Sequence, residues 1–262
     1  LSFNYCLFLF FHLIYKLCRM RFFQGCANFW SCHSFFSTKP DISVDCVIFG
    51  YDGEKLQVLL SKKGSEAPSE QYSTTKLPGR LLHVDEDLDD AANDIISKLT
   101  GNKHPMIRQF HAYGSPTRTQ NPRDIIWLEN AIKQKIGRIV TISYLSLMRI
   151  TNRTPKAIAG HDVAWYPVNE LPELAFDHKQ IILDTLQEIY SLAGQQPQLL
   201  FEMMPPKFTA LQLRRLHEQI TGQSIDVRNF AKLVMTKSYI IPLDEFEQNV
   251  SHRAARFYRF KA

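Results

Sequence analysis

The chain has 262 residues, 45% of them apolar, and 31 Lys and Arg against 26 Asp and Glu give it a formal charge of +5. This length allows one large domain or two ordinary ones, and the composition excludes disordered, collagen-like and disulfide-stapled chains. No uncharged apolar run reaches the roughly 18 residues that a membrane-spanning helix needs.

The charge is unevenly distributed along the sequence. Residues 1–40 have a net charge of +4, residues 41–200 a net charge of −3, and residues 201–262 again a net charge of +4. This distribution indicates a body that faces small molecules or proteins, followed by a C-terminal module that faces an anion.

The first 38 residues are the segment least typical of a folded domain. The aromatic run Tyr5–Tyr15 precedes three basic residues, whereas a secretory signal has its charges before the apolar core. We expect residues 1–38 to be an extension outside the working protein, read in frame upstream of a start near Met20; an interfacial membrane anchor is the alternative. Beyond this extension the sequence has a single cysteine, Cys46, which fits a reducing cytoplasm.

The body, residues 39–195, alternates strands and helices without a regular βαβ rhythm. Strands are expected at 44–50, 56–60, 107–113, 139–148 and 163–167. Helices are expected at 87–99, 123–134 and 179–192. The Asp52-Gly53 dipeptide predicts a hairpin between the first two strands, and Gly101 predicts the end of the first helix. The body is therefore predicted to be a mixed α+β layer structure.

The stretch LPGRLLHVDEDLDDAANDIISKLTG, residues 77–101, resembles the Nudix box. In working members of that family, glutamates of a loop–helix–loop bind Mg²⁺ around a nucleoside diphosphate. The resemblance implies a Nudix-like α/β/α sandwich for this body. Aligned on Gly101, Glu86 takes the place of the first glutamate of the box, and Arg80 takes the place of its glycine.

The rest of the box departs from the family. Asp94 replaces its arginine, and the three remaining acidic positions are filled by Ile95, Lys98 and Leu99. A hard cation needs carboxylate, water and phosphate oxygens, which these side chains do not supply. We therefore expect no metal, no cofactor and no catalytic residue in this domain.

An alternative metal site is a stripe formed by Glu86, Asp90 and Asp94, spaced four residues apart along one helix face. Such like charges repel mildly in the absence of a cation. Acidic residues also gather at a helix start because the helix dipole favours them there. The three acids are therefore either a metal site or a cluster that the helix dipole favours.

Guanidinium and ammonium groups of the body are candidates for binding the phosphates or hydroxyls of a ligand. These candidate ligand-binding residues are Lys62, Arg80, Arg118, Arg123 and Arg138. The stretch at 161–182, with its Leu-Pro-Glu-Leu-Ala-Phe-Asp-His element, resembles one Nudix-related subgroup. Within it, His178 is interpreted as a residue at a helix start with Asp177 as the N-cap, although a role as ligand or base is the alternative.

The C-terminal module, residues 200–262, has the pattern of a winged helix-turn-helix. Helices are expected at 210–221, where Thr209 and Gln212 form a capping box, and at 227–236, capped by Asp226. Strands at 239–243 and 255–260 complete the wing.

Winged helices present their second helix to the major groove of duplex DNA and contact phosphates around it. The predicted DNA-binding residues are Arg228, Asn229, Lys232, Arg253, Arg256 and Arg259. Winged helices also serve as protein–protein modules, but the net charge of +4 favours DNA.

Both halves together resemble the NrtR-type Nudix-related transcriptional regulators, from about Phe36 to the end of the chain. The resemblance rests on MPPKFTALQLRRLHEQITGQSIDVRNFAKLV and the terminal RAARFYRF. It implies a cytoplasmic, homodimeric repressor that binds double-stranded DNA, has no membrane partner and responds to a small-molecule effector, a nucleotide-sugar or a sugar. The alternative function is a Mg²⁺-dependent pyrophosphohydrolase of the ADP-ribose class.

Overall fold

The computed structural model describes residues 40–62, 75–133, 135–151, 154, 158–251 and 253–261. The predicted extension at 1–38 lies outside these residues and stays a prediction. Within the described ranges, no helix is both long and apolar enough to cross a membrane.

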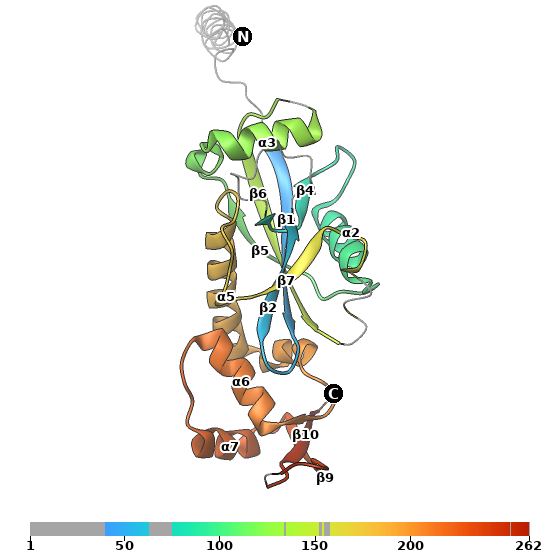
Figure 1. Cartoon of the computed structure of the whole chain (residues 1–262), viewed down its shortest axis with the longest axis vertical. Helices are drawn as coiled ribbons and strands as arrows, with labels where there is room; N and C mark the ends of the chain where they lie inside the picture. The colour runs from blue at the N-terminus through green and yellow to red at the C-terminus, as the bar shows by residue number, and fades with distance from the viewer. Residues whose placement is uncertain are drawn as a thin grey trace, which may run out of the picture. The chain divides into compact units, whose positions relative to one another are not determined.

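The body is a mixed sheet with helices on both faces (Figure 1). In the described part of the chain the sheet has the order β3-β2-β1-β6-β5, and β4 and β7 add to β1 and β2. Its strands are β1 (Asp41–Tyr51), β2 (Leu56–Lys62), β3 (Thr75–Lys76), β4 (Gly79–Leu81), β5 (Arg108–Tyr113), β6 (Ile139–Arg149) and β7 (Val163–Pro167). Its helices are α2 (Leu88–Thr100), α3 (Pro122–Ile132) and α5 (His178–Gln195), with 3₁₀ segments η2 (Pro116–Thr119) and η3 (Pro197–Met203). The predicted α+β layer structure is confirmed, and the short strands β3 and β4 are additions to it.

Strand β1 is the centre of this sheet. It pairs with β6 in parallel over its whole length and with β2 and β4 in antiparallel fashion. Because successive side chains point to opposite faces, Val44, Cys46 and Ile48 pack against α2, while Val47 and Phe49 pack on the α5 side. A strand covered on both faces accounts for the nearly continuous apolar run in the sequence.

The predicted hairpin between β1 and β2 is confirmed. The Asp52 carboxylate accepts hydrogen bonds from the backbone N–H of Glu54 and of Lys55, at 2.8 and 2.7 Å. Gly53 has a φ of 102°, which an L side chain rarely adopts. The turn is therefore held by its own residues and fixes the register of the first two strands.

The C-terminal module is a winged helix. Its elements are β8 (Phe208–Thr209), α6 (Ala210–Thr221), α7 (Val227–Thr236), β9 (Ile240–Phe246) and β10 (Arg256–Phe260), with the strands in the order β8-β10-β9. The capping box of Thr209 and Gln212 is present at the start of α6, and Asp226 caps α7. Glu218 stabilises the turn between α6 and α7, because its carboxylate accepts hydrogen bonds from the Arg214 guanidinium and from the Ile225 N–H.

Helix α6, the first helix of the winged helix, is hydrogen-bonded to the β1–β2 hairpin of the body. The Tyr51 hydroxyl lies 3.1 Å from the Gln212 carbonyl oxygen, and Gln219 bonds the backbone at Leu56 and at Glu54. One apolar core runs from the α5 face of the sheet through η3 into α6 and α7. The predicted domain division between residues 195 and 200 falls where α5 passes into η3, and it stays a prediction.

Removing the N-cap of α6 tests how much the capping hydrogen bond contributes to the stability of the protein. Replacing Thr209, which is 3% exposed, with Ala leaves the Gln212 N–H without its acceptor. We expect Thr209→Ala to lower the free energy of unfolding by about 1 kcal/mol, measured by urea denaturation. Thr236→Ala, at an exposed position, is the control and should change it by less than about 0.5 kcal/mol. Equal effects of the two variants would contradict the capping role.

Candidate ligand pocket and DNA-facing surface

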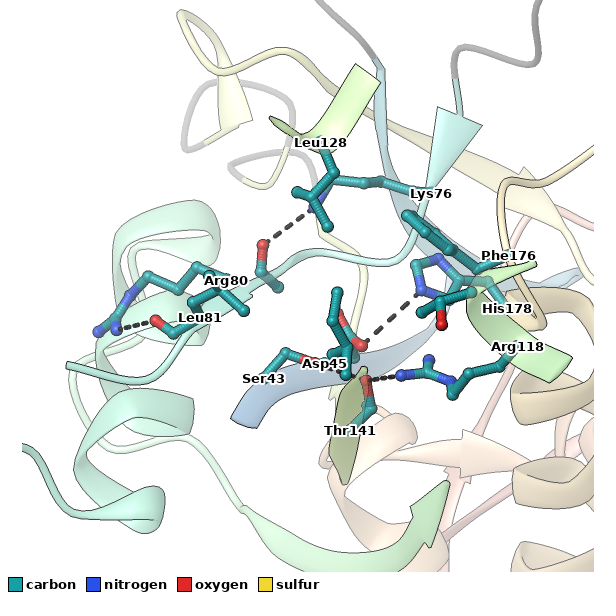
Figure 2. Close-up of a pocket in the computed structure, with 13 residues that line it drawn as sticks. Ser43, Asp45, Lys76, Arg80, Leu81, Arg118, Leu128, Thr141, Phe176 and His178 are labelled. Carbon is teal, nitrogen blue, oxygen red and sulfur yellow. Dashed lines mark hydrogen bonds and ion pairs between the residues drawn. The ribbon is translucent and has the colours of Figure 1, made fainter. Parts of the chain in front are cut away.

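A small pocket of about 50 Å³, partly open to solvent, lies at the start of β1 on the side that α5 covers. Figure 2 shows its lining. The residues are contributed by β1, β3, β4, η2, α3, β6 and the start of α5: Ser43, Asp45, Lys76, Gly79, Arg80, Leu81, Arg118, Thr119, Leu128, Ile139, Thr141, Phe176 and His178.

Arg118 is a buried cation in this lining. Its side chain is only 3% exposed, and its guanidinium donates two hydrogen bonds to Asp177, at 3.0 and 2.8 Å. A third donor reaches the Thr141 hydroxyl at 2.5 Å, and this hydroxyl also meets Ser43 Oγ at 2.5 Å. The paired charges offset the cost of burying the guanidinium and hold η2 against the start of α5.

His178 is the most buried titratable group of the pocket. Its Nδ1 accepts a hydrogen bond of 3.0 Å from the Leu77 N–H, which assigns the ring proton to Nε2. The Nε2 atom lies 3.7 Å from Asp45 Oδ2. Burial lowers the pKa of the imidazole to about 4, so the ring is neutral at pH 7.

Lys76 and Gly79 complete this end of the pocket. The Lys76 Nζ donates a 3.0 Å hydrogen bond to the Gly79 carbonyl, and burial lowers the pKa of this ammonium group. A Cβ atom on Gly79 would stand 1.9 Å from Asp45 Oδ1 and 2.6 Å from the Val44 carbonyl. Glycine is therefore required here by the close approach of the Asp45 carboxylate.

The acidic side chains Glu86 and Asp94 of the Nudix-like segment form ion pairs with basic side chains of the same chain. The Arg80 guanidinium bonds Glu86 through two nitrogens, at 2.6 and 2.5 Å, and reaches Asp94 at 3.4 Å. Lys98 Nζ lies 2.8 Å from the Asp94 carboxylate. The hydrogen bonds from Arg80 lower the pKa of Glu86 to about 2, and the bond from Lys98 lowers the pKa of Asp94.

The structure differs from the alternative interpretation of Glu86, Asp90 and Asp94 as a carboxylate stripe. Helix α2 begins at Leu88 with Asp87 as its N-cap, so Glu86 precedes the helix and does not share its face with Asp90 and Asp94. Asp90 is exposed. In the part of the chain that the structure describes, no group of three or more His, Cys, Asp or Glu side chains is placed to hold a metal ion.

The predicted ligand-binding residues separate into three sets. Arg80 and Arg118 line the pocket. Lys62 is exposed at the end of β2, and the exposed Arg138 donates to the Gly114 carbonyl, so neither is part of this lining. The side chain of Arg123 lies outside the described residues.

Sequence reasoning missed most of the neutral and acidic lining, including Ser43, Asp45, Thr141 and Phe176. One available signal was Asp45, a charge inside the apolar run of β1. Phe176 has a φ of 57°, and the Asp124 carboxylate accepts a hydrogen bond from its N–H at 2.8 Å. A non-glycine residue in the left-handed region is typical of functional segments, but the sequence does not reveal it.

The second candidate surface is the polar face of α7. Arg228, Asn229 and Lys232 are exposed there, and Arg253 and Arg259 are exposed on the wing. Phe230 and Val234, four residues apart on one side of α7, are buried, whereas Val227 is 59% exposed. It stands beside Arg228 and Asn229 at the N-terminus of the helix, where base contacts of such helices begin.

Arg256 differs from the other predicted DNA-binding residues. Its guanidinium donates to the Leu243 carbonyl and to the Asp244 carboxylate, both at 2.6 Å, and so joins β10 to β9. A second ion pair, Lys207 with Glu245 at 2.6 Å, neutralises another acid of β9. The exposed predicted cations of the module are therefore Arg228 and Lys232 of α7 and Arg253 and Arg259 of the wing.

The winged helix is where known proteins match most directly. The model of the NrtR DNA-binding winged helix domain matches residues 200–260. The C-terminal module is therefore similar to the DNA-binding domain of the NrtR-type regulators. The "ADPR responsive transcriptional repressor NtrR" of Acinetobacter baylyi is 25% identical over 228 residues, which cover 84% of this chain and 82% of that protein.

Solved structures are similar to this chain over both of its halves. Shewanella oneidensis NrtR complexed with a 27mer DNA is 26% identical, with a TM-score of 0.63 over 84% of this chain and 93% of that one. A MutT/nudix family protein from Enterococcus faecalis, 23% identical, shares the fold with a TM-score of 0.58 over 90% of this chain and 93% of its own. The expected combination of a Nudix-like body and a winged helix is confirmed.

The buried His178 predicts how the stability of this chain depends on pH. Its pKa is about 4 in the folded chain, mainly because the ring is buried, against about 6.5 in the unfolded chain. The charged groups around the ring are Asp45 and Asp177, which raise this pKa, and Lys76 and Arg118, which lower it. Between these values the unfolded state binds more protons, so the contribution is full above pH 6.5 and is lost as the pH falls toward 4. We expect it to amount to about 3 kcal/mol.

The measurement is the free energy of unfolding by urea at pH 7 and at pH 4.5. His178→Asn places an amide oxygen close to the position of Nδ1 as an acceptor for the Leu77 N–H but has no titrating group, so it should lose less stability over this range than the wild type. Parallel losses in the two proteins would assign the acid sensitivity to other groups.

Proposed function

We propose that the chain is a ligand-responsive, DNA-binding transcriptional regulator that acts in the cytoplasm as a homodimer on a palindromic site. The observation that carries this proposal is the winged helix, whose α7 presents exposed Arg228, Asn229 and Lys232 on a module that matches the NrtR DNA-binding domain. Arg and Asn side chains suit guanine and adenine edges, and Lys suits phosphate.

The effector in this proposal binds in the pocket at the start of β1. ADP-ribose is the first candidate, because the Acinetobacter baylyi relative is described as ADPR responsive. The pocket has hydroxyls, two guanidinium groups and a buried carboxylate, which fit a ligand that carries both hydroxyls and negative charge. Regulation requires only that the ligand bind one arrangement of the regulator more tightly than another.

We also propose that the Nudix-like body does not hydrolyse its ligand. The support is the engagement of Glu86 and Asp94 by Arg80 and of Asp94 by Lys98, which leaves these carboxylates bonded to cations of the chain itself. A magnesium ion would have to displace a bidentate guanidinium from Glu86.

DNA binding is tested by fluorescence anisotropy with duplexes from the region upstream of the gene and of its neighbours, with and without ADP-ribose. We expect specific binding that weakens with salt and changes when ADP-ribose is added. Arg228→Ala should cost about 1–3 kcal/mol and relax specificity at one base pair, whereas Lys232→Ala should weaken binding to all duplexes and reduce the salt slope by about 1.

Two further variants separate direct contacts from effects on the fold. Lys103→Ala changes an exposed lysine of the body and should leave DNA affinity unchanged. Arg256→Ala breaks the link between β9 and β10, so any loss of affinity should come with a lower melting temperature. A protein that ignores every duplex at low ionic strength would contradict the proposal and favour a protein-binding winged helix.

Catalysis is tested by phosphate release from ADP-ribose in the presence of Mg²⁺. We expect no turnover above the buffer background with the wild-type chain, because Arg80 and Lys98 occupy the acids that a metal would need. Robust turnover that Glu86→Gln abolishes would instead identify a pyrophosphohydrolase of the ADP-ribose class.

A further inference from the structure

A second pocket, of about 470 Å³ and partly open to solvent, lies between the end of α5 and the helices of the winged helix. We call it the α5–α7 pocket. It shares no lining residue with the pocket at the start of β1. Its walls are mostly apolar, and four of its side chains are at most 8% exposed: Leu213, Ile220, Phe230 and Val234. Both the volume and the apolar lining are typical of small-molecule sites.

Large apolar side chains also remain exposed at this pocket. Tyr190 of α5 is 56% exposed and Leu233 of α7 is 48% exposed, although both belong to the lining. An isolated apolar side chain on a surface needs no explanation, whereas apolar side chains gathered around a hollow mark a place where an apolar group binds. The body of a ligand for this pocket is therefore apolar.

The charge in the lining comes from a single lysine. Lys237 is half-buried at the end of α7, and within the described part of the chain it forms no ion pair. It lies close to His217 of α6, whose ring packs against Phe230 at 5.6 Å between centroids. Burial lowers the pKa of His217, and the Lys237 ammonium lowers it further, so the ring is neutral at pH 7 and has one N–H to donate.

These groups decide the chemistry of the polar end of the ligand. The described lining contains no carboxylate, so a ligand cation would meet only the repulsion of Lys237. A neutral apolar molecule would cover the ammonium without giving it a partner, which is costly. A carboxylate both pairs with Lys237 and accepts from His217, and such charge-assisted hydrogen bonds are the strong ones. A nucleotide does not fit, because its several charges would face apolar walls.

We propose that the α5–α7 pocket binds a small apolar carboxylic acid, with its ring or branched chain between α5 and α7 and its carboxylate on Lys237 and His217. The pocket touches the recognition helix on the side of Phe230 and Lys237, opposite to Arg228 and Lys232 at 100° per residue. The acid is thereby a second effector, because a bound anion adds negative charge beside that helix and weakens its binding to DNA. This effector role rests on the proposed DNA-binding function, whereas the binding of the acid does not.

The experiment compares three probes that share one ring: phenylacetate, the neutral phenylacetamide and the cationic 2-phenylethylamine. Each is added at millimolar concentration to the full chain, and binding is measured by ligand-observed NMR. We expect phenylacetate to bind, phenylacetamide to bind roughly 10-fold more weakly and the amine not to bind, as follows from a charge-assisted hydrogen bond. The His217 ring signals should shift on titration with phenylacetate.

Lys237→Met retains the aliphatic stem of the side chain and removes the ammonium group. It should abolish the preference for phenylacetate over phenylacetamide, whereas Lys103→Met, at an exposed lysine of the body, is the matched control and should keep it. Saturating phenylacetate should lower the affinity of the wild type for duplex DNA by about 2-fold or more, as expected for one added charge near the interface.

Three outcomes would overturn the acid site: no binding of phenylacetate, equal binding of phenylacetate and phenylacetamide, or a Lys237→Met variant that keeps the preference. The first two use the wild-type chain, so they decide the matter even if the variant does not fold. Bound phenylacetate that leaves the DNA affinity unchanged would overturn the effector role. A chain that binds phenylacetate but no duplex at all would count against the regulator and not against the acid site.

Discussion

The parallel pairing of β1 with β6 is the constraint on which the rest of this structure depends. It runs from Asp41 to Tyr51 and places the whole strand between α2 and α5. Because side chains alternate, Ser43 and Asp45 face the pocket on the side where Val47 and Phe49 build the core. The same alternation brings Tyr51, at the far end of that row, against α6. A shift of one residue in this pairing would turn the pocket residues to the opposite face and remove pocket and docking contact together.

Charge pairing explains why a pocket with so many ionisable groups is compatible with a stable fold. Arg118 is compensated by Asp177, and Arg80 by Glu86 and Asp94. Both sets of ion pairs stabilise the fold. The pair of Arg118 with Asp177 joins η2 to the start of α5, and Arg80 joins Glu86, in the loop before α2, to Asp94 of α2. The pocket thus retains cations that shape it without a large net positive charge. Removing one partner of the buried pair would leave a charge uncompensated, which costs far more than the pair itself contributes.

The elements of this fold could be predicted well where a local signal exists. The caps at Thr209, Asp226 and Gly101, and the Asp52-Gly53 turn, are set by residues within four positions of one another, and the structure has each of them. The pocket could be predicted only in part, because it is assembled from segments that lie far apart in the sequence. Arg80 and Arg118 stand out as cations, whereas Ser43 and Thr141 gain meaning only from the pairing of β1 with β6. Whether an arginine faces a ligand or a carboxylate, as for Arg256, depends on a partner that the sequence does not place.

Two elements connect the pocket with the winged helix, and they constrain any mechanism of regulation. Helix α5 begins at His178 in the pocket lining, and its buried residues Ile189 and Leu192 lie near its other end, within reach of η3 and α6. Strand β1 makes the second connection, through Tyr51 and the hairpin that Gln219 bonds. With two attachments and a shared core, α6 is not free to swing independently of the sheet within one chain. A ligand that moves the start of α5 would therefore displace the body and the winged helix together, and in a dimer such a displacement changes the spacing of the two recognition helices. The coupling then needs no hinge within the protomer, only two dimer arrangements that the ligand binds unequally.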